Sequence, residues 1–261
     1  MSELIEVTLE RQIAQVALNR PAAYNAFNYE MVSELGDHLT ALAGDENVMA
    51  VVITGRGKAF CAGGDLKWAI GNSTRPAAAF HRLAARFHLA ILEIRRMHKP
   101  VIAAINGVAA GGGFSLALAC DFRIMEKSAV LRQAYTSSGL CINGGGTFTL
   151  PRLVGYARAL EIAAFDEPIP SEQALAWGLV TRIAEDGQSL IEATKAAQLL
   201  SQNSLNSFAW CKKLITDSFN TSFETQIERE RAALEACADH PDGLEGLRAF
   251  SEKRKPNYFI H

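Results

Sequence analysis

The chain has 261 residues, of which 49% are hydrophobic and 21% charged, so it can bury the core of one large domain, with or without a small appendage. Its formal net charge of −2 gives no electrostatic reason to expect nucleic acid or an anionic membrane as a partner. The first residues lack the basic and apolar segments of a signal peptide, and the five cysteines are dispersed without a CxxC motif. We therefore expect a cytoplasmic protein with reduced thiols, no membrane span and no metal site.

The first half of the chain alternates strand and helix patterns. A hairpin turn is expected at residues 10–12, Asn28 is a plausible N-cap, and short apolar runs ended by glycine or proline indicate buried strands. Glycines 111–113 mark the start of a further helix. The expected strands are 6–9, 13–18, 50–54, 101–105 and 121–125, and the expected helices are 29–42 and 76–97.

The second half is mostly helical. The expected helices are 147–153, 157–165, 171–177 and 189–201, followed by three more up to residue 253. No low-complexity segment and no repeat of the length found in solenoid proteins is visible in the sequence. We predict an α/β core over residues 1–202 and a helical C-terminal region over residues 203–261.

Three segments carry a recognisable pattern: residues 58–67, 100–113 and 144–155. The opening residues 18–26 and the closing residues 250–256 match the same pattern in order and spacing. Together they resemble the crotonase (enoyl-CoA hydratase/isomerase) superfamily over essentially the whole chain. The nearest resemblance is to its aromatic-pocket branch, which is 4-chlorobenzoyl-CoA dehalogenase-like and phenylacetyl-CoA-pathway isomerase-like.

This resemblance implies a ββα-spiral fold whose helical C-terminal region builds homotrimers that often pair into homohexamers. It also implies an acyl-CoA substrate whose thioester oxygen is held by the backbone N–H groups of Gly64 and Gly112. The physical interpretation agrees, because a helix start leaves N–H groups without intrahelical partners, and such donors stabilise a developing negative charge. The alternative is that Gly111–Gly113 form only a tight turn between a strand and a helix.

The residues that family hydratases use for acid–base chemistry are missing. The resemblance implies glutamates at the positions of Ser115 and Tyr135, and some family isomerases have an aspartate at the position of Asn143. Water addition needs two carboxylates, so ordinary hydration is not expected and isomerase or other non-hydratase chemistry is favoured. His88 matches a histidine of the aromatic-pocket branch, and histidine is the residue type best suited to act as a general base or acid near neutral pH.

We therefore hypothesise that His88 transfers the proton, while Tyr135, Ser115 and Asn143 hydrogen-bond around the acyl carbons. A His88 that packs on its helix without a catalytic role is the competing interpretation, and His81 is expected to be inert. Two other functions stay open at this point. One is a thioester hydrolase or decarboxylase that uses Ser115, His88 and Tyr135, and the other is a catalytically weak acyl-CoA-binding homologue.

Coenzyme A is expected only as part of the substrate, with no permanently bound cofactor. The resemblance implies adenine near residues 62–66, pantetheine beside the loop 22–24, and a C-terminal contact that comes from a neighbouring subunit. The residues it assigns to these contacts are Ala22, Tyr24, Ala62, Asp65, Leu66, Lys67, Phe250 and Lys253, with Arg20 as a further candidate for a phosphate. Aromatic residues near the predicted pocket, namely Tyr24, Trp68, Phe87, Phe114 and Tyr135, hint at a cyclic or aromatic acyl group, or belong to the core.

Overall fold

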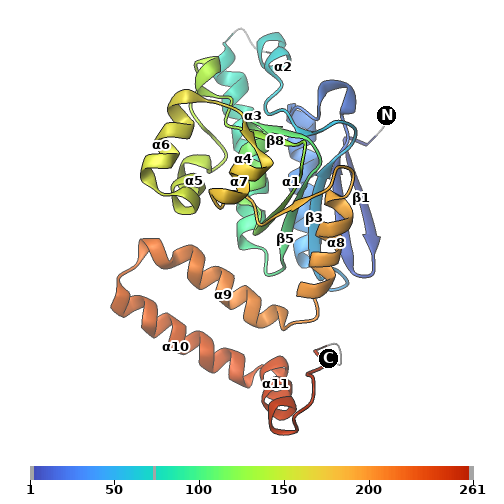
Figure 1. Ribbon diagram of the computed structural model, residues 1–261, viewed down its shortest axis with the longest axis vertical. Coiled ribbons are helices and arrows are strands. Elements are labelled where there is room, and N and C mark those ends of the chain that lie inside the picture. Colours follow the sequence, from blue (N-terminus) through green and yellow to red (C-terminus); the bar gives the residue numbers. More distant parts are fainter. Residues whose placement is uncertain (1–2, 73–74, 259–261) are drawn as a thin grey trace.

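The computed structural model describes residues 3–72 and 75–258. Its core contains two β-sheets surrounded by helices, and three C-terminal helices extend away from that core (Figure 1). The larger sheet has six strands in the order β1-β2-β3-β5-β7-β10, with β1 and β2 antiparallel and the other pairs parallel. These strands are β1 (Ile5–Glu10), β2 (Ile13–Leu18), β3 (Ala50–Gly55), β5 (Val101–Ile105), β7 (Phe122–Glu126) and β10 (Arg182–Ala184).

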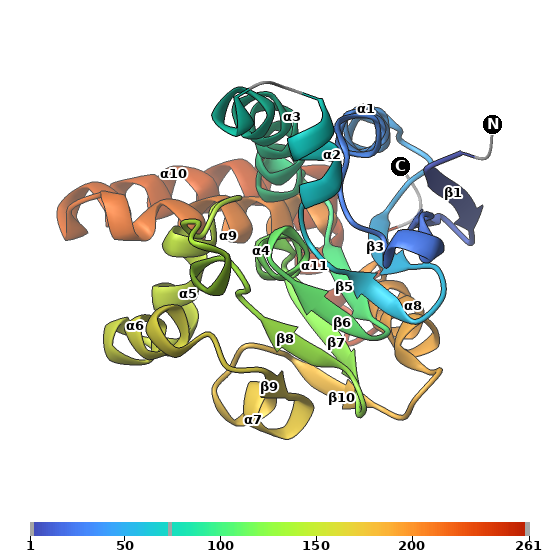
Figure 2. The same cartoon turned by 90° about the horizontal axis from the view of Figure 1, so that it is seen from above.

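The central strands are covered on both faces, which explains why they read as continuous apolar runs. Side chains alternate between the faces: Val51 and Ile53 join the hydrophobic cluster beneath α1 (Tyr29–Gly44) and α3 (Pro76–Arg96). Ala50 and Val52 point the other way, into a smaller cluster with α8 (Ser189–Leu200). Figure 2 shows the large sheet between these two layers of helix.

A second sheet contains four short strands in the order β4-β6-β8-β9. They are β4 (Ala59–Cys61), β6 (Val108–Ala110), β8 (Val130–Arg132) and β9 (Ile169–Pro170). Each of β3, β5 and β7 is followed in the chain by β4, β6 and β8 respectively, and then by a helix or a turn of helix. The chain thus repeats a unit of one strand in each sheet plus a helix, which is the ββα arrangement that the family resemblance implied.

The predicted long elements are confirmed, with boundaries within about two residues. The remaining core helices are α2 (Leu66–Gly71), α4 (Gly112–Ala119), α5 (Gly146–Val154), α6 (Tyr156–Phe165) and α7 (Ser171–Ala176). The sequence did not predict α2 or the short strands β4, β6, β8, β9 and β10. Segments of two to six residues are too short to show a hydrophobic period.

The C-terminal region consists of α9 (Leu205–Asp217), α10 (Phe223–Asp239) and α11 (Pro241–Ser251). Serine N-caps start the first two helices, at Ser204 and Ser222. Lys212 fastens α9 to the core, because its Nζ lies 2.8 Å from the Asp121 carboxylate. None of the helices in the described ranges is long and apolar enough to cross a membrane.

Candidate active site

Two loops meet where the neighbouring strands β4 and β6 end. The strands are parallel, with Ala59 opposite Val108, so their carboxyl ends lie at the same edge of the small sheet. Residues 62–65 follow β4 and lead into α2, and Gly111 follows β6 and leads into α4. Segments about fifty residues apart in sequence therefore lie side by side.

Glycine is required for the two loops to approach each other. A Cβ atom on Gly113 would lie 2.2 Å from the Cys61 carbonyl oxygen, and one on Gly63 would lie 3.0 Å from the Ala110 oxygen and 3.2 Å from the Gly112 nitrogen. Gly63 also has a φ of +101°, which other residues rarely adopt. Contact between the two backbones thus explains Gly63 and Gly113, whereas a Cβ on Gly64 would meet only the Leu83 Cδ2 atom, at 3.8 Å.

The backbone N–H groups of Gly64 and Gly112 have no acceptor among the described residues. Phe27 bridges to Gly64, but the bridge uses the Gly63 oxygen (2.7 Å) and the Asp65 nitrogen (2.8 Å), so the Gly64 N–H points away from it. Gly112 is the first residue of α4 and therefore has no intrahelical acceptor. Both glycines line the same cavity, so the two unpartnered N–H groups belong to residues that border one space.

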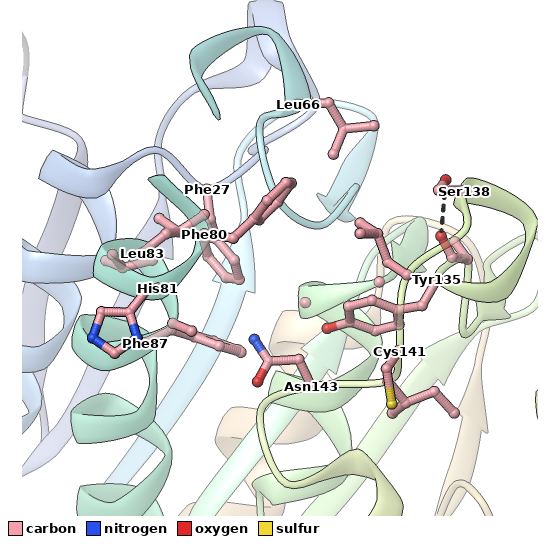
Figure 3. A pocket seen from close by; sticks show the side chains of 18 of the residues that line it. Phe27, Leu66, Phe80, His81, Leu83, Phe87, Tyr135, Ser138, Cys141 and Asn143 are labelled. Carbon is pink, nitrogen blue, oxygen red and sulfur yellow. Dashed lines mark hydrogen bonds between the residues drawn. The ribbon is translucent and has the colours of Figure 1, made fainter. Parts of the chain in front are cut away.

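This cavity, called the acyl cavity below, has a volume of about 540 Å³ and mostly apolar walls. In Figure 3, Phe27, Phe80 and Leu83 lie on one side, Tyr135 and Cys141 on the other, and Asn143 near the base. No aspartate or glutamate belongs to the described residues that line it. Among the described parts of the chain, no group of three or more His, Cys, Asp or Glu side chains is placed to hold a metal ion.

A polar cluster forms part of this wall. The Asn143 Oδ1 lies 2.6 Å from the His88 Nε2, and the Asn143 carbonyl oxygen accepts a hydrogen bond of 2.6 Å from the Ser115 hydroxyl. Since an amide oxygen can only accept, the neutral His88 ring carries its proton on Nε2. Burial raises the pKa of Tyr135 to about 12, while hydrogen bonds with Ser115 and the Asn143 backbone act in the opposite direction. The Tyr135 hydroxyl is therefore protonated at neutral pH.

Comparison with known proteins identifies the family. A family model described as enoyl-CoA hydratase/isomerase matches residues 8–259. The chain belongs to the enoyl-CoA hydratase/isomerase family. It is 33% identical to the 1,2-epoxyphenylacetyl-CoA isomerase of Escherichia coli (strain K12), with 99% of both chains covered. It is 31% identical to 4-chlorobenzoyl coenzyme A dehalogenase-2 of Arthrobacter sp, over 92% of this chain and 88% of that one.

The crystal structure of an enoyl-CoA hydratase from Polaromonas sp. JS666 has the same fold. The TM-score is 0.93 at 36% identity, and the match covers 97% of this chain and 98% of the other. The predicted superfamily, its aromatic-pocket branch and the α/β fold with a helical C-terminal region are thereby confirmed.

Within this family fold, the four side chains predicted around the acyl carbons do gather, but not all reach the cavity. Tyr135 and Asn143 line it, whereas Ser115 is fully buried behind the wall and His88 is exposed outside the lining. The expected direct contact of Ser115 and His88 with an acyl group therefore needs correction. His81, which we expected to be inert, does line the cavity.

Not all the aromatic residues predicted near the pocket line the cavity. Phe87 and Tyr135 line the cavity as predicted, but Phe114 lies in the core, because every residue of the short helix α4 is buried. Trp68 packs against the core and stacks on Tyr29, with their ring centroids 6.3 Å apart. Phe27 and Phe80 line the cavity instead, although no sequence pattern singled them out.

The residues assigned to coenzyme A fall into three groups. Ala62 and Leu66 line the cavity, whereas Ala22, Tyr24 and Lys67 are exposed and not part of its lining. Phe250 and Lys253 lie at the end of α11, and Figure 1 shows α11 at the opposite end of the molecule from α2.

Asp65 has a structural task, because its carboxylate caps α2 through the Trp68 nitrogen and pairs with Arg20 at 3.1 Å. Arg20 also donates to the Ala26 carbonyl, so this guanidinium already has partners within the fold. A phosphate contact from Arg20 would require it to share these donors.

Proposed function

We propose that this protein converts an acyl-CoA thioester through an enolate, with the thioester oxygen held between the N–H groups of Gly64 and Gly112. The observation that carries the proposal is the pair of unpartnered amides that line one cavity. Backbone donors that are fixed before the reaction stabilise charge on an oxygen without reorganising, and one such donor is worth roughly 2.7–4 kcal/mol in the transition state. The buried start of α4 adds the positive end of a helix dipole at the same point.

The reaction is isomerisation or another non-hydratase conversion. Hydration needs one carboxylate to activate water and a second acid to protonate carbon, and the described lining contains no carboxylate. Ser115 and Tyr135 occupy the positions of the two hydratase glutamates. Neither replaces a base: the Ser115 hydroxyl is buried and donates to a carbonyl, and Tyr135 retains its proton.

Proton transfer is assigned to His88 acting through an intervening water, because its ring contacts Asn143 and does not itself line the cavity. The 2.6 Å contact with the amide oxygen fixes the proton on Nε2 and leaves the lone pair on Nδ1. His81 is the second candidate, because it lines the acyl cavity directly. The two histidines lie on the same helix, so single replacements separate their roles.

The acyl group is aromatic or cyclic. Four rings, those of Phe27, Phe80, Phe87 and Tyr135, contribute to a cavity of about 540 Å³. Rings stack on rings in offset or edge-on geometry, and each such pair adds roughly 0.5–1.5 kcal/mol beyond simple burial. The relatives named above include enzymes whose names specify ring-containing acyl-CoA compounds, 1,2-epoxyphenylacetyl-CoA and 4-chlorobenzoyl-CoA.

Coenzyme A enters and leaves as part of the substrate, and the working form is a homotrimer or homohexamer. Ala62 and Leu66, which line the cavity, are assigned to contacts with the adenine. The loop with Ala22 and Tyr24 is assigned to contacts with the pantetheine arm. Phe250 and Lys253 then meet coenzyme A from a neighbouring subunit. The proposed homotrimer or homohexamer is supported by large apolar side chains that are exposed on the C-terminal helices, such as Leu234 at 72% and Phe250 at 85%.

We place the protein in the cytoplasm, because all five cysteines are free.

Exchange of α-protons with solvent tests the enolate directly. Purified protein is incubated in D₂O with a panel of arylacetyl-, cyclic and linear acyl-CoA thioesters, and deuterium at the α-carbon is followed by mass spectrometry. The proposal predicts exchange, fastest for an aryl or cyclic compound, without release of CoA. Release of free thiol or CO₂ would instead support a hydrolase or decarboxylase, and binding without exchange across the panel would indicate a catalytically weak homologue.

A further inference from the structure

A second cavity, of about 280 Å³, lies between the core and α9 and shares no lining residue with the acyl cavity. Its walls come from α3, α4, β7 and α5 on the core side and from α9 and the following turn on the other. Four cationic side chains line it, Arg95, Arg123, Arg152 and Lys212, against the single carboxylate of Asp121. We refer to it as the basic cavity.

Two of these cations, Lys212 and Arg123, already have hydrogen-bond acceptors within the fold. Lys212 donates to the Asp121 carboxylate at 2.8 Å and to the Ile94 carbonyl at 2.8 Å. Arg123 donates to two backbone carbonyls, those of Leu179 at 2.7 Å and Cys120 at 2.6 Å. The one carboxylate in the basic cavity is thus hydrogen-bonded to Lys212, and no hydrogen bond joins it to Arg95 or Arg152 among the described residues.

Arg95 and Arg152 are not satisfied in this way. The Arg152 guanidinium lies between two rings, 3.4 Å from the Phe148 centroid and 4.8 Å from that of Phe219, and the Arg95 guanidinium lies 4.9 Å from the same Phe148 ring. Arg152 donates to the Phe148 carbonyl through Nη1, but its Nε is buried without a partner. Arg95 has no hydrogen-bond acceptor among the described residues.

Two like charges therefore share one aromatic ring at a partly buried position. Burial lowers the pKa of Arg95, and the positive charge of Arg152 lowers it further, while Asp121 and Asp217 act in the opposite direction. A buried donor without an acceptor is costly, and so are two like charges held close together at a partly buried position. An anion between the two guanidinium groups removes both costs.

We propose that the basic cavity binds a small oxyanion, a phosphate or a carboxylate, between Arg95 and Arg152. Guanidinium groups match the planar or tetrahedral oxygens of such ligands through paired N–H donors. The apolar walls formed by Leu118, Leu153 and Ile215 admit a short organic part as well. Arg95 on α3 and Arg152 on α5 both belong to the core, so the anion joins two core helices beside the apolar side chain of Ile215 on α9.

Calorimetric titration of the full chain with inorganic phosphate, and separately with acetate, tests the proposal at constant ionic strength set by chloride. Wild type is expected to bind at least one of them saturably, and Arg95→Met to bind it about tenfold or more weakly, because charge-assisted hydrogen bonds are lost. Arg158→Met is the matched control, since Arg158 stacks on Trp177 and pairs with Glu161 away from the cavity. Arg95→Lys keeps the positive charge but loses the planar pair of N–H donors, so it should bind the anion with intermediate affinity.

Circular dichroism without phosphate checks that each variant is folded. If Arg95→Met does not fold, Arg95→Lys replaces it as the test variant. Equal affinity in wild type and Arg95→Met would assign the anion to another place, such as the coenzyme A phosphate site, and would overturn the proposal. A wild-type chain that binds neither anion also overturns it. If Arg95→Met in that case lowers the mass found by ultracentrifugation, a carboxylate of a second copy occupies the cavity in place of a free ligand.

Discussion

Replacing Gly112 with proline removes one of the two cavity N–H groups and leaves the start of α4 able to form. Gly112 is the first residue of the helix, where proline is well tolerated because no intrahelical bond is lost. Gly112→Ala is the matched control. In both variants a Cβ meets the Phe27 ring, 3.1 Å from Cδ2 and 3.3 Å from Cε2, but alanine retains the N–H.

The shared contact with Phe27 should cost both variants similar stability, about 1–3 kcal/mol for crowding in a packed core. Loss of the donor, together with the proline ring carbon that takes the place of the amide hydrogen, should then lower the rate of α-proton exchange in Gly112→Pro by at least roughly 100- to 1,000-fold relative to Gly112→Ala. The assay is deuterium incorporation at saturating acyl-CoA, with urea unfolding of both variants alongside. Equal exchange rates in two folded variants would refute the assignment of the Gly112 N–H to the thioester oxygen.

Three further predictions concern neighbouring side chains. His88→Ala should lower the exchange rate by about 100-fold or more, and His81→Ala should lower it by much less. Single-turnover measurements test this, and the reverse order would assign proton transfer to His81. Burial raises the pKa of Tyr135 from 10.0 to about 12, so its contribution to stability is complete below pH 10 and is lost as the pH rises through 12. Urea unfolding should therefore show the advantage of wild type over Tyr135→Phe unchanged near neutrality and shrinking in that alkaline range; a constant difference contradicts this. Asp65→Ala should destabilise the fold by about 1 kcal/mol or more and Asp65→Asn by less, since asparagine still caps α2; equal losses would exclude the cap as the cause.

Sequence patterns predicted the helices and strands that are long enough to show a hydrophobic period. The buried runs of β3 and β5 and the apolar face of α3 are each set by local residue order. The small sheet escaped prediction because its strands have two or three residues, and their pairing joins distant segments, such as Ala59 with Val108. Such strands are stabilised by tertiary packing, which no local window contains.

The family resemblance assigned Gly64 and Gly112, whereas the direction of a side chain could not be predicted from the sequence. The neighbouring glycines Gly63 and Gly113 touch across the two loops, a contact that only the folded chain shows. His81 and His88 are seven residues apart and lie on about the same face of α3, yet only His81 lines the cavity, because seven residues of helix move a side chain about 10 Å along the axis. Sequence spacing gives the face of a helix but not which of its turns borders a cavity.

The most direct measurement is a crystal structure of the protein with an unreactive aryl acyl-CoA. It should place the thioester oxygen within about 3.2 Å of the backbone nitrogens of both Gly64 and Gly112. A thioester oxygen held by a side chain instead, or amides turned away from it and bonded to other carbonyls, would contradict the proposed function.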